Sequence, residues 1–441
     1  MRKQVSYLRK HFYLDILALF FLVLSFFIEP IVSAINGNFV FNPVTQVFEG
    51  YLKIITSPSI LITDYVYIAG LGATFFNVAT ILIINILLIR LLKIEYTGPV
   101  YAGIVMIVGF SFFGKNIFNT LPIYLGIYLF SIFKKIPYKF FVLTILFSTG
   151  ISPLVSNVIF GLGFEWYIGV PLGILCGVIA GFVLPALASH TIVFHEGYNL
   201  FNIGFALGII AVCFYGVFKF FGLNFQLASN YDYSNSLIFY ILLPVISAFS
   251  IVIGIFGDRR VVNKYFRLIK TTGRLITDYA YEFGIDTVLF NQGLIGMILF
   301  IVCLVFKVPL NGVVFGSILS ILGFAGAGVH IRNVLPVWVG AGITIFLGMV
   351  INKNYELTIS SMMAFIFASG LAPIAGRYGI VFGLLAGGLH IMITPLTITF
   401  QGGIDLYNNG FSAGFVASIV NVMAEKVFHR GDRSGRKSKD M

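Results

Sequence analysis

The stretch YLKIITSPSILITDYVYIAGLGATFFN at residues 51–77 decides the organisation of this chain, because it recurs at residues 265–291 as YFRLIKTTGRLITDYAYEFGIDTVLFN. The two stretches align without a gap, so Asp64 of the first corresponds to Asp278 of the second, an offset of 214 residues. A self-match of this length indicates an internal duplication. We therefore predict that the chain consists of two copies of one unit.

The duplication extends well beyond the opening stretch. Three further pairs match: NTLPIYLG at 119–126 with NVLPVWVG at 333–340, STGISP at 148–153 with ASGLAP at 368–373, and GYNLFNIGF at 197–205 with GIDLYNNGF at 403–411. The offset falls from 220 in the second pair to 206 in the third, which places a fourteen-residue insertion in the first copy. We assign residues 1–222 to the first repeat, 223–428 to the second and 429–441 to a basic tail.

The composition indicates a membrane protein. The chain is 59% hydrophobic and only 10% charged, against about a quarter charged residues in an average soluble protein. Apolar runs of about twenty residues, the length that crosses a hydrocarbon core, follow one another closely. We therefore predict an all-α integral membrane protein, because a β-barrel would show short segments of alternating polarity instead.

We expect about fourteen transmembrane or re-entrant helices. They lie near residues 14–34, 70–89, 98–113, 117–133, 139–159, 166–188 and 200–221 in the first copy, and near 236–256, 286–306, 310–327, 333–351, 356–374, 378–399 and 406–424 in the second. The first apolar run also resembles a signal peptide. Its counterpart at the start of the second copy favours a retained helix.

The distribution of basic residues predicts the orientation. The amino tail, the Arg259–Arg274 loop and the carboxyl tail are rich in Lys and Arg and should be cytoplasmic, whereas the connection 222–236 carries no Lys or Arg. Equivalent loops differ: residues 35–62 are almost free of basic residues, while their counterpart in the second copy is strongly basic. The same loop therefore lies on opposite sides of the membrane in the two copies, which predicts inverted repeats with an odd number of crossings each.

Several classes of function lack the required motifs. The chain has no Walker loop, no Rossmann glycine motif after a strand and no His-Glu-x-x-His, so we expect no nucleotide or metal cofactor and no enzymatic activity. Its three cysteines are isolated in apolar runs. The net charge of +11 is explained by basic residues at helix ends and tails, so no nucleic-acid partner is expected.

Polar residues that occur at equivalent positions of both copies are the candidate solute or ion ligands. They are Asp64 with Asp278, Asn77 with Asn291, Asn199 with Asp405, and Asn202 with Asn408. Acids are rare in this chain, so a duplicated Asp suggests a coupling-ion site, although Thr-Asp before a helix is also an ordinary N-cap. On a helix, Asn199 and Asn202 would share one face as residues i and i+3, and so would Asp405 and Asn408. Interfacial loops that cap the last helix of each copy remain the alternative.

His195 and Glu196 have no titratable equivalents, since Gln401 and Gly402 occupy those places. They are candidates for a proton relay, and a solvated turn is the alternative. We interpret Lys115 as a cation at a helix end whose ammonium extends to the interface.

The repeated ITDY motif, together with GYNLFNIGF and GIDLYNNGF, resembles a prokaryotic membrane family that carries a domain of unknown function, numbered 1576. The resemblance covers nearly the whole chain and implies no substrate. In architecture alone, the plan is similar to urea transporters and to seven-plus-seven inverted-repeat transporters. The Leu-Pro-x-x-Thr-x-Pro-Phe signature of urea transporters is not reproduced at residues 394–400.

Inverted repeats are a recurring plan of secondary transporters, with the solute site near the bilayer midplane. We therefore predict a transporter for a small polar solute in the cell membrane, inner or plasma, coupled to H+ or Na+, with both termini cytoplasmic. A passive channel for a neutral solute is the alternative, followed by a membrane-embedded enzyme and by a structural role. The expected partners are the lipid bilayer and the solute, and assembly into a homo-oligomer stays open.

Overall fold

The computed structural model describes residues 2–35, 42–226, 230–352 and 355–437, and these residues form helices and no strands. The first half contains α1 (Arg2–Ile35), α2 (Pro43–Ile55), α3 (Tyr65–Leu91), α4 (Gly98–Phe110), α5 (Ile117–Lys134), α6 (Val142–Ser148), α7 (Ser152–Phe160), α8 (Trp166–Phe194) and α9 (Asn202–Phe220). The second half contains α10 (Ser236–Gly257), α11 (Val261–Leu268), α12 (Tyr279–Glu282), α13 (Ile285–Val305), α14 (Gly312–Leu322), α15 (Ile331–Ile351), α16 (Ile359–Phe367), α17 (Ala372–Tyr378), α18 (Ile380–Gln401) and α19 (Asn408–Lys437). The protein is thus all-helical over the described residues.

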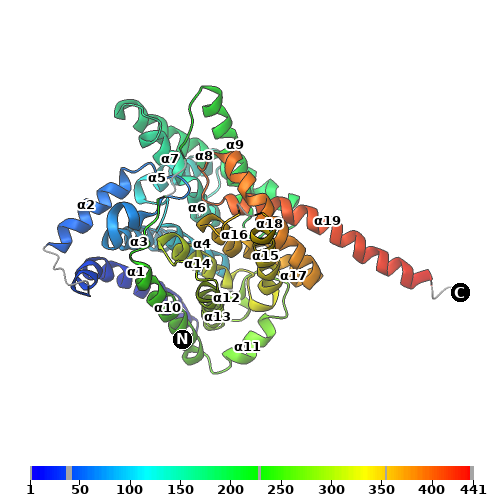
Figure 1. Cartoon of the computed structure of the whole chain (residues 1–441). Coiled ribbons are helices and arrows are strands. Elements are labelled where there is room, and N and C mark those ends of the chain that lie inside the picture. The colour runs from blue at the N-terminus through cyan, green and yellow to red at the C-terminus, as the bar shows by residue number, and fades with distance from the viewer. Residues whose placement is uncertain (1, 36–41, 227–229, 353–354, 438–441) are drawn as a thin grey trace.

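Eleven helical segments of the described residues are long and apolar enough to cross a membrane. They agree within a few residues with expected spans, except that α3 begins five residues before the expected residue 70 and α8 ends six residues after the expected residue 188. The expected spans 98–113 and 310–327 are the short helices α4 and α14. The expected span 406–424 lies within α19, which is not among the eleven and which extends away from the body of the protein (Figure 1).

The outer surface of the helices is apolar. Phe220 on α9 and Phe256 on α10 are 85% and 84% exposed, and Leu, Ile and Val side chains surround them on the same faces. Such a surface is stable in hydrocarbon and unfavourable in water. Together with the eleven segments, it identifies a multi-pass membrane protein.

The short helices α4 and α14 form the centre of the molecule, where they lie side by side (Figure 1). Nearly all of their residues are buried. They approach closely because Gly109 of α4 faces Gly316 of α14, and a Cβ on Gly109 would lie 2.2 Å from the Gly316 carbonyl oxygen. Small residues permit this kind of close approach between membrane helices.

Glycines interrupt the first helix after each ITDY motif. Gly70 (φ 82°) breaks α3 near its start, and Gly284 (φ 90°) separates α12 from α13. Both conformations lie in the left-handed region that glycine adopts without strain. The interruption therefore recurs at equivalent positions of the two halves.

One helix lies in a region that we expected to be a loop. Residues 43–55 form α2, which begins with Pro43 and buries Val47, Gly50 and Ile54 on one face against α3. A proline at the first turn and apolar residues at helical spacing are both helix signals. The corresponding stretch of the second half forms the shorter α11, which packs on α13.

Candidate binding site

Backbone hydrogen bonds join the non-helical segments between the apolar helices of each half to the other half. The four bonds are Leu61 N–H to Gly403 O (2.9 Å), Leu275 N–H to Gly197 O (3.0 Å), Leu200 N–H to Gly370 O (2.9 Å) and Leu406 N–H to Gly150 O (2.9 Å). The first two bonds are equivalent under the sequence duplication, and so are the last two. The interface between the two halves therefore contains each of these two kinds of hydrogen bond twice.

Asp64 and Asp278 are both helix N-caps. The Oδ1 atom of Asp64 accepts the Val66 N–H at 3.0 Å, and Oδ1 of Asp278 accepts the Tyr281 N–H at 3.0 Å. Asp278 also accepts the Gly98 N–H at 2.7 Å, at the start of α4 in the other half. Capping thus occupies both carboxylates, and their contact with a solute or ion stays a prediction.

The surroundings of these two carboxylates differ. Asp64 is buried, and its Oδ2 accepts the N–H of Asp232 at 3.0 Å, from the connection between the halves. Asp278 is half-buried. The connection therefore contacts the buried Asp64 through the N–H of Asp232.

Asn77 and Asn291 hold the ends of the short helices. The Nδ2 group of Asn77 donates to the carbonyl oxygens of Ser111 and Lys115, both at 2.8 Å. Asn291 makes the equivalent bonds to Ala325 and Val329 at 3.0 and 2.8 Å. These bonds give the pair a positioning role for the segments that follow α4 and α14.

Asn199 and Asn202 do not lie on one helical face, because α9 begins only at Asn202. Asn199 donates to the Gly410 carbonyl oxygen at 2.9 Å, across the interface between the halves. In the second half Asp405 likewise precedes α19, which begins at Asn408. The helical spacing that we assumed for both pairs is therefore wrong, because each of these segments is a turn before the helix.

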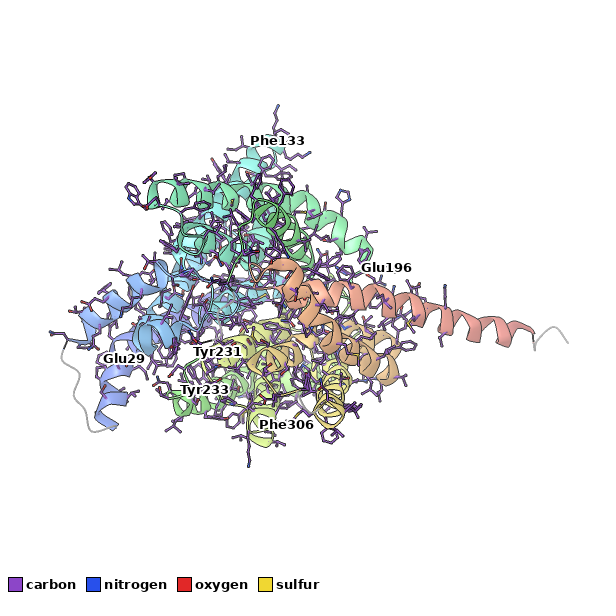
Figure 2. All side chains as sticks on the ribbon, turned by 45° about the horizontal axis from the view of Figure 1, so that its top comes forward. Glu29, Phe133, Glu196, Tyr231, Tyr233 and Phe306 are labelled. Carbon is purple, nitrogen blue, oxygen red and sulfur yellow. The ribbon has the colours of Figure 1, made fainter. Side chains whose placement is uncertain are left out.

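The side chains of His195 and Glu196 lie in different surroundings. His195 is buried and its Nε2 pairs with Asn202 Oδ1 at 2.9 Å. Glu196 is exposed and lies 3.7 Å from Arg274, whose guanidinium stacks on Tyr198. Figure 2 shows Glu196 beside α19, far from Tyr231 and Tyr233 of the connection. The two side chains are thus separate features, and their role as a relay stays a prediction.

Lys115 is the polar residue that our sequence analysis misjudged. It follows α4 and is fully buried rather than extended to an interface. Its Nζ donates to Thr149 Oγ1 at 2.7 Å and to the hydroxyl of Tyr407 in the other half. The ammonium also lies over the rings of Phe110 and Tyr407, at 4.9 and 4.5 Å from their centroids. The charge is therefore held by neutral oxygens and aromatic faces inside the bundle.

Asp405 provides the opposite charge. It is fully buried, and its Oδ1 accepts the N–H of Tyr407, the residue whose hydroxyl accepts from Lys115, at 2.8 Å. Its Oδ2 has no hydrogen-bond partner among the described residues. Tyr407 thus connects a buried cation from one half with a buried anion from the other.

The duplication supplies a neutral copy of this arrangement. Lys115, Thr149, Asp405 and Tyr407 correspond to Val329, Ser369, Asn199 and Phe201. The same fold therefore exists once with the charge pair and once without it. A comparison of these positions between the copies would have revealed the pair from the sequence, because both charges fall at one of the two related places.

The chain matches the family described as protein of unknown function (DUF1576) over residues 44–220 and 258–426. The chain belongs to the DUF1576 family. No curated protein and no solved structure matches it.

A cavity of about 160 Å³ lies between the two halves beside Leu275 and Ile276. Its wall is mainly apolar and includes Met106, Phe147, Phe201 and Phe324, with Asn202 and Tyr407 as polar members. Ile276 is 79% exposed at its rim. The cavity thus reaches from the surface near Arg274 to the residue that connects Lys115 with Asp405.

The place that is equivalent to this cavity under the duplication also lies between the two halves, and it is filled. Leu61 and Ile62, the counterparts of Leu275 and Ile276, are each 4% exposed, and Asn408, the counterpart of Asn202, is 1% exposed. Phe113 is fully buried where the cavity has Ala327. The two related places therefore differ in access, one open and one closed.

Within the described residues, no group of three or more His, Cys, Asp or Glu side chains is arranged to hold a metal ion. The polar atoms near the cavity are carboxamide, hydroxyl and backbone groups instead. Such groups suit a small organic solute or a proton better than a transition metal.

Proposed function

We propose that this protein is a secondary transporter for a small polar solute, built from two inverted repeats that alternate access to a site between them. The observation that carries the proposal is the difference between the two related places, one of which is open beside Ile276 and one closed beside Ile62. In an inverted-repeat transporter, exchanging the conformations of the two halves would open the closed place and close the open one. Coupling would use H+ or Na+.

Further support comes from the paired contacts between the halves. Equivalent backbone bonds join 61 to 403 and 275 to 197, so either half can supply the same contact to the other. The two N-cap residues Asp64 and Asp278 each also contact the short helix of the opposite half. Asp278 accepts the Gly98 N–H at the start of α4, and Asp64 lies beside Gly312 at the start of α14. Reciprocal contacts of this kind suit a protein that moves between two related end states.

The basic residues favour a cytoplasmic position for the Arg274 surface and for both termini, in the cell membrane, inner or plasma. On that orientation the cavity opens to the cytoplasm. The connection that covers Asp64 then closes the external side.

A passive channel for a neutral solute is the second candidate. The apolar wall of the cavity, with Asn202 as the one carboxamide in its lining, favours a solute without a full charge. A channel would conduct without the open and closed places exchanging. Transport that saturates and that depends on an ion gradient separates the carrier from the channel.

Ligand binding can be tested by thermal stabilisation of the purified protein against a panel of small metabolites and ions. A ligand at a hundredfold excess over its Kd stabilises the folded state by about 2.7 kcal/mol. We expect the variant Ala327→Phe to remain folded and to lose this stabilisation, because it places in the cavity the residue that stands at the closed equivalent, Phe113. The lipid-facing variant Val217→Phe is the control and should respond as the wild type.

The double variant Asp64→Asn/Asp278→Asn belongs to the same experiment. Asparagine keeps an acceptor oxygen for each cap and removes both charges. If binding is lost in this variant but the protein stays folded, the carboxylates contact the solute or ion. A panel in which no compound stabilises the wild type, or in which Ala327→Phe responds fully, would contradict binding in this cavity.

A further inference from the structure

We propose that Lys115 and Asp405 form a buried proton-binding site, in which Asp405 takes up one proton from the cavity while Lys115 keeps its charge. A role of this site in coupling transport rests on the proposed function. The binding of a proton does not rest on it, because it follows from the charges, their burial and their contacts.

The fold does not need these two charges. The related place in the other half has Val329 and Asn199 and forms the same helices and the same interface bonds. A buried ion pair is weak evidence for stability, because the desolvation of two charges opposes their attraction. Ionisable residues inside a membrane bundle are therefore better explained by function.

The contacts of Asp405 favour a proton over a metal cation. One carboxylate oxygen accepts the Tyr407 N–H, and the other has no hydrogen-bond partner among the described residues. A buried carboxylate oxygen without a donor is unfavourable, and protonation removes its charge. The Lys115 ammonium close to it repels a sodium ion, which would also need several oxygen ligands.

Tyr407 places the pair next to the cavity. This residue lines the cavity, its hydroxyl accepts from Lys115 and its N–H donates to Asp405. The other groups that face the pair are neutral: Thr149 and the ring of Phe110 contact Lys115, and Tyr124 of α5 lies near Tyr407. His390 on α18 is bound to Asn409 and Ser412.

A solvent proton bonds to a carboxylate oxygen of Asp405, which becomes a neutral carboxylic acid, and the site changes from two opposite charges to a single positive charge on Lys115. Release of the proton on the other side of the membrane restores the two opposite charges. No oxidant, reductant or second substrate takes part.

Infrared difference spectroscopy of the purified protein during an acid titration tests the site directly. We expect acidification to produce carbonyl bands of buried carboxylic acids in the wild type, and one of these bands belongs to Asp405. That band should be absent in Asp405→Asn and in Lys115→Val/Asp405→Asn, and it should remain in Asp64→Asn, which removes the other buried carboxylate. The double variant carries the residues of the neutral copy, so it keeps the test valid if the single variant does not fold.

Two outcomes would overturn the inference: a double variant whose carbonyl bands are the same as those of the wild type, or an Asp405 carboxylate that stays ionised throughout the pH range in which the protein is folded. A band removed by sodium chloride at constant pH, with potassium chloride as the control, would replace the proton by Na+ and also overturn it. Failure of the solute panel would leave this infrared result unchanged, so the two proposals fail independently.

Discussion

Replacing either member of the buried pair alone, as Lys115→Val or Asp405→Asn, is expected to lower the free energy of unfolding by about 3–5 kcal/mol. Each single change leaves the other charge fully buried without its counter-charge. The double variant Lys115→Val/Asp405→Asn removes both charges and reproduces Val329 and Asn199 of the related place. Its stability should therefore lie close to that of the wild type.

The measurement is a double-mutant cycle on thermal unfolding in detergent, which isolates the interaction between the two side chains. The matched control is the ion pair between Asp15 and Arg90, whose side chains are 41% and 42% exposed. Removing one partner of that exposed pair should change the stability by about 0–1 kcal/mol. Additive single effects at Lys115 and Asp405 would contradict the interaction.

The second large effect is expected at the crossing of α4 and α14. In Gly109→Ala the new Cβ would lie 2.2 Å from both the Gly316 carbonyl oxygen and Ser320 Oγ. In Gly316→Ala it would lie 2.3 Å from the Gly109 carbonyl oxygen. The helices must therefore separate, and overpacking of this kind typically costs about 1–3 kcal/mol and occasionally more.

Gly216→Ala on α9 is the control, because nothing lies within 4 Å of its added Cβ. An alanine inside a helix is about 1 kcal/mol more favourable than glycine, so this variant should be as stable as the wild type or slightly more stable. Thermal unfolding of the three variants provides the comparison. Wild-type stability of Gly109→Ala would show that α4 and α14 do not cross as closely as described.

Much of the fold could be predicted because the signals are local. Apolar runs of sufficient length identify the long helices. The N-cap interpretation of Asp64 and Asp278 rests on their position before a helix, which neighbouring residues determine. The helix α2 was missed because a short helix buried on one face resembles a loop between two long apolar spans.

The charge pair could not be placed from local signals. Lys115 follows an apolar run, which is typical of a cation at a helix end, and its burial depends on Thr149 and on Tyr407, 292 residues further along the chain. The same limit applies to Asn199 and Asp405, whose helical spacing was assumed from the sequence although each lies in a turn. Long-range packing decides the surroundings of these residues.

The most direct test of the two inverted repeats is the side of the membrane on which equivalent positions lie. Thr56 and Lys270 are separated by the 214-residue offset, and both are exposed polar residues. Each would be replaced by cysteine after the exposed Cys213 is changed to serine, and labelled with an impermeant maleimide in right-side-out and inverted vesicles. We predict that Thr56→Cys reacts only from outside and Lys270→Cys only from the cytoplasmic side. Labelling of both positions from the same side would contradict the inverted repeats and, with them, the proposed exchange of access.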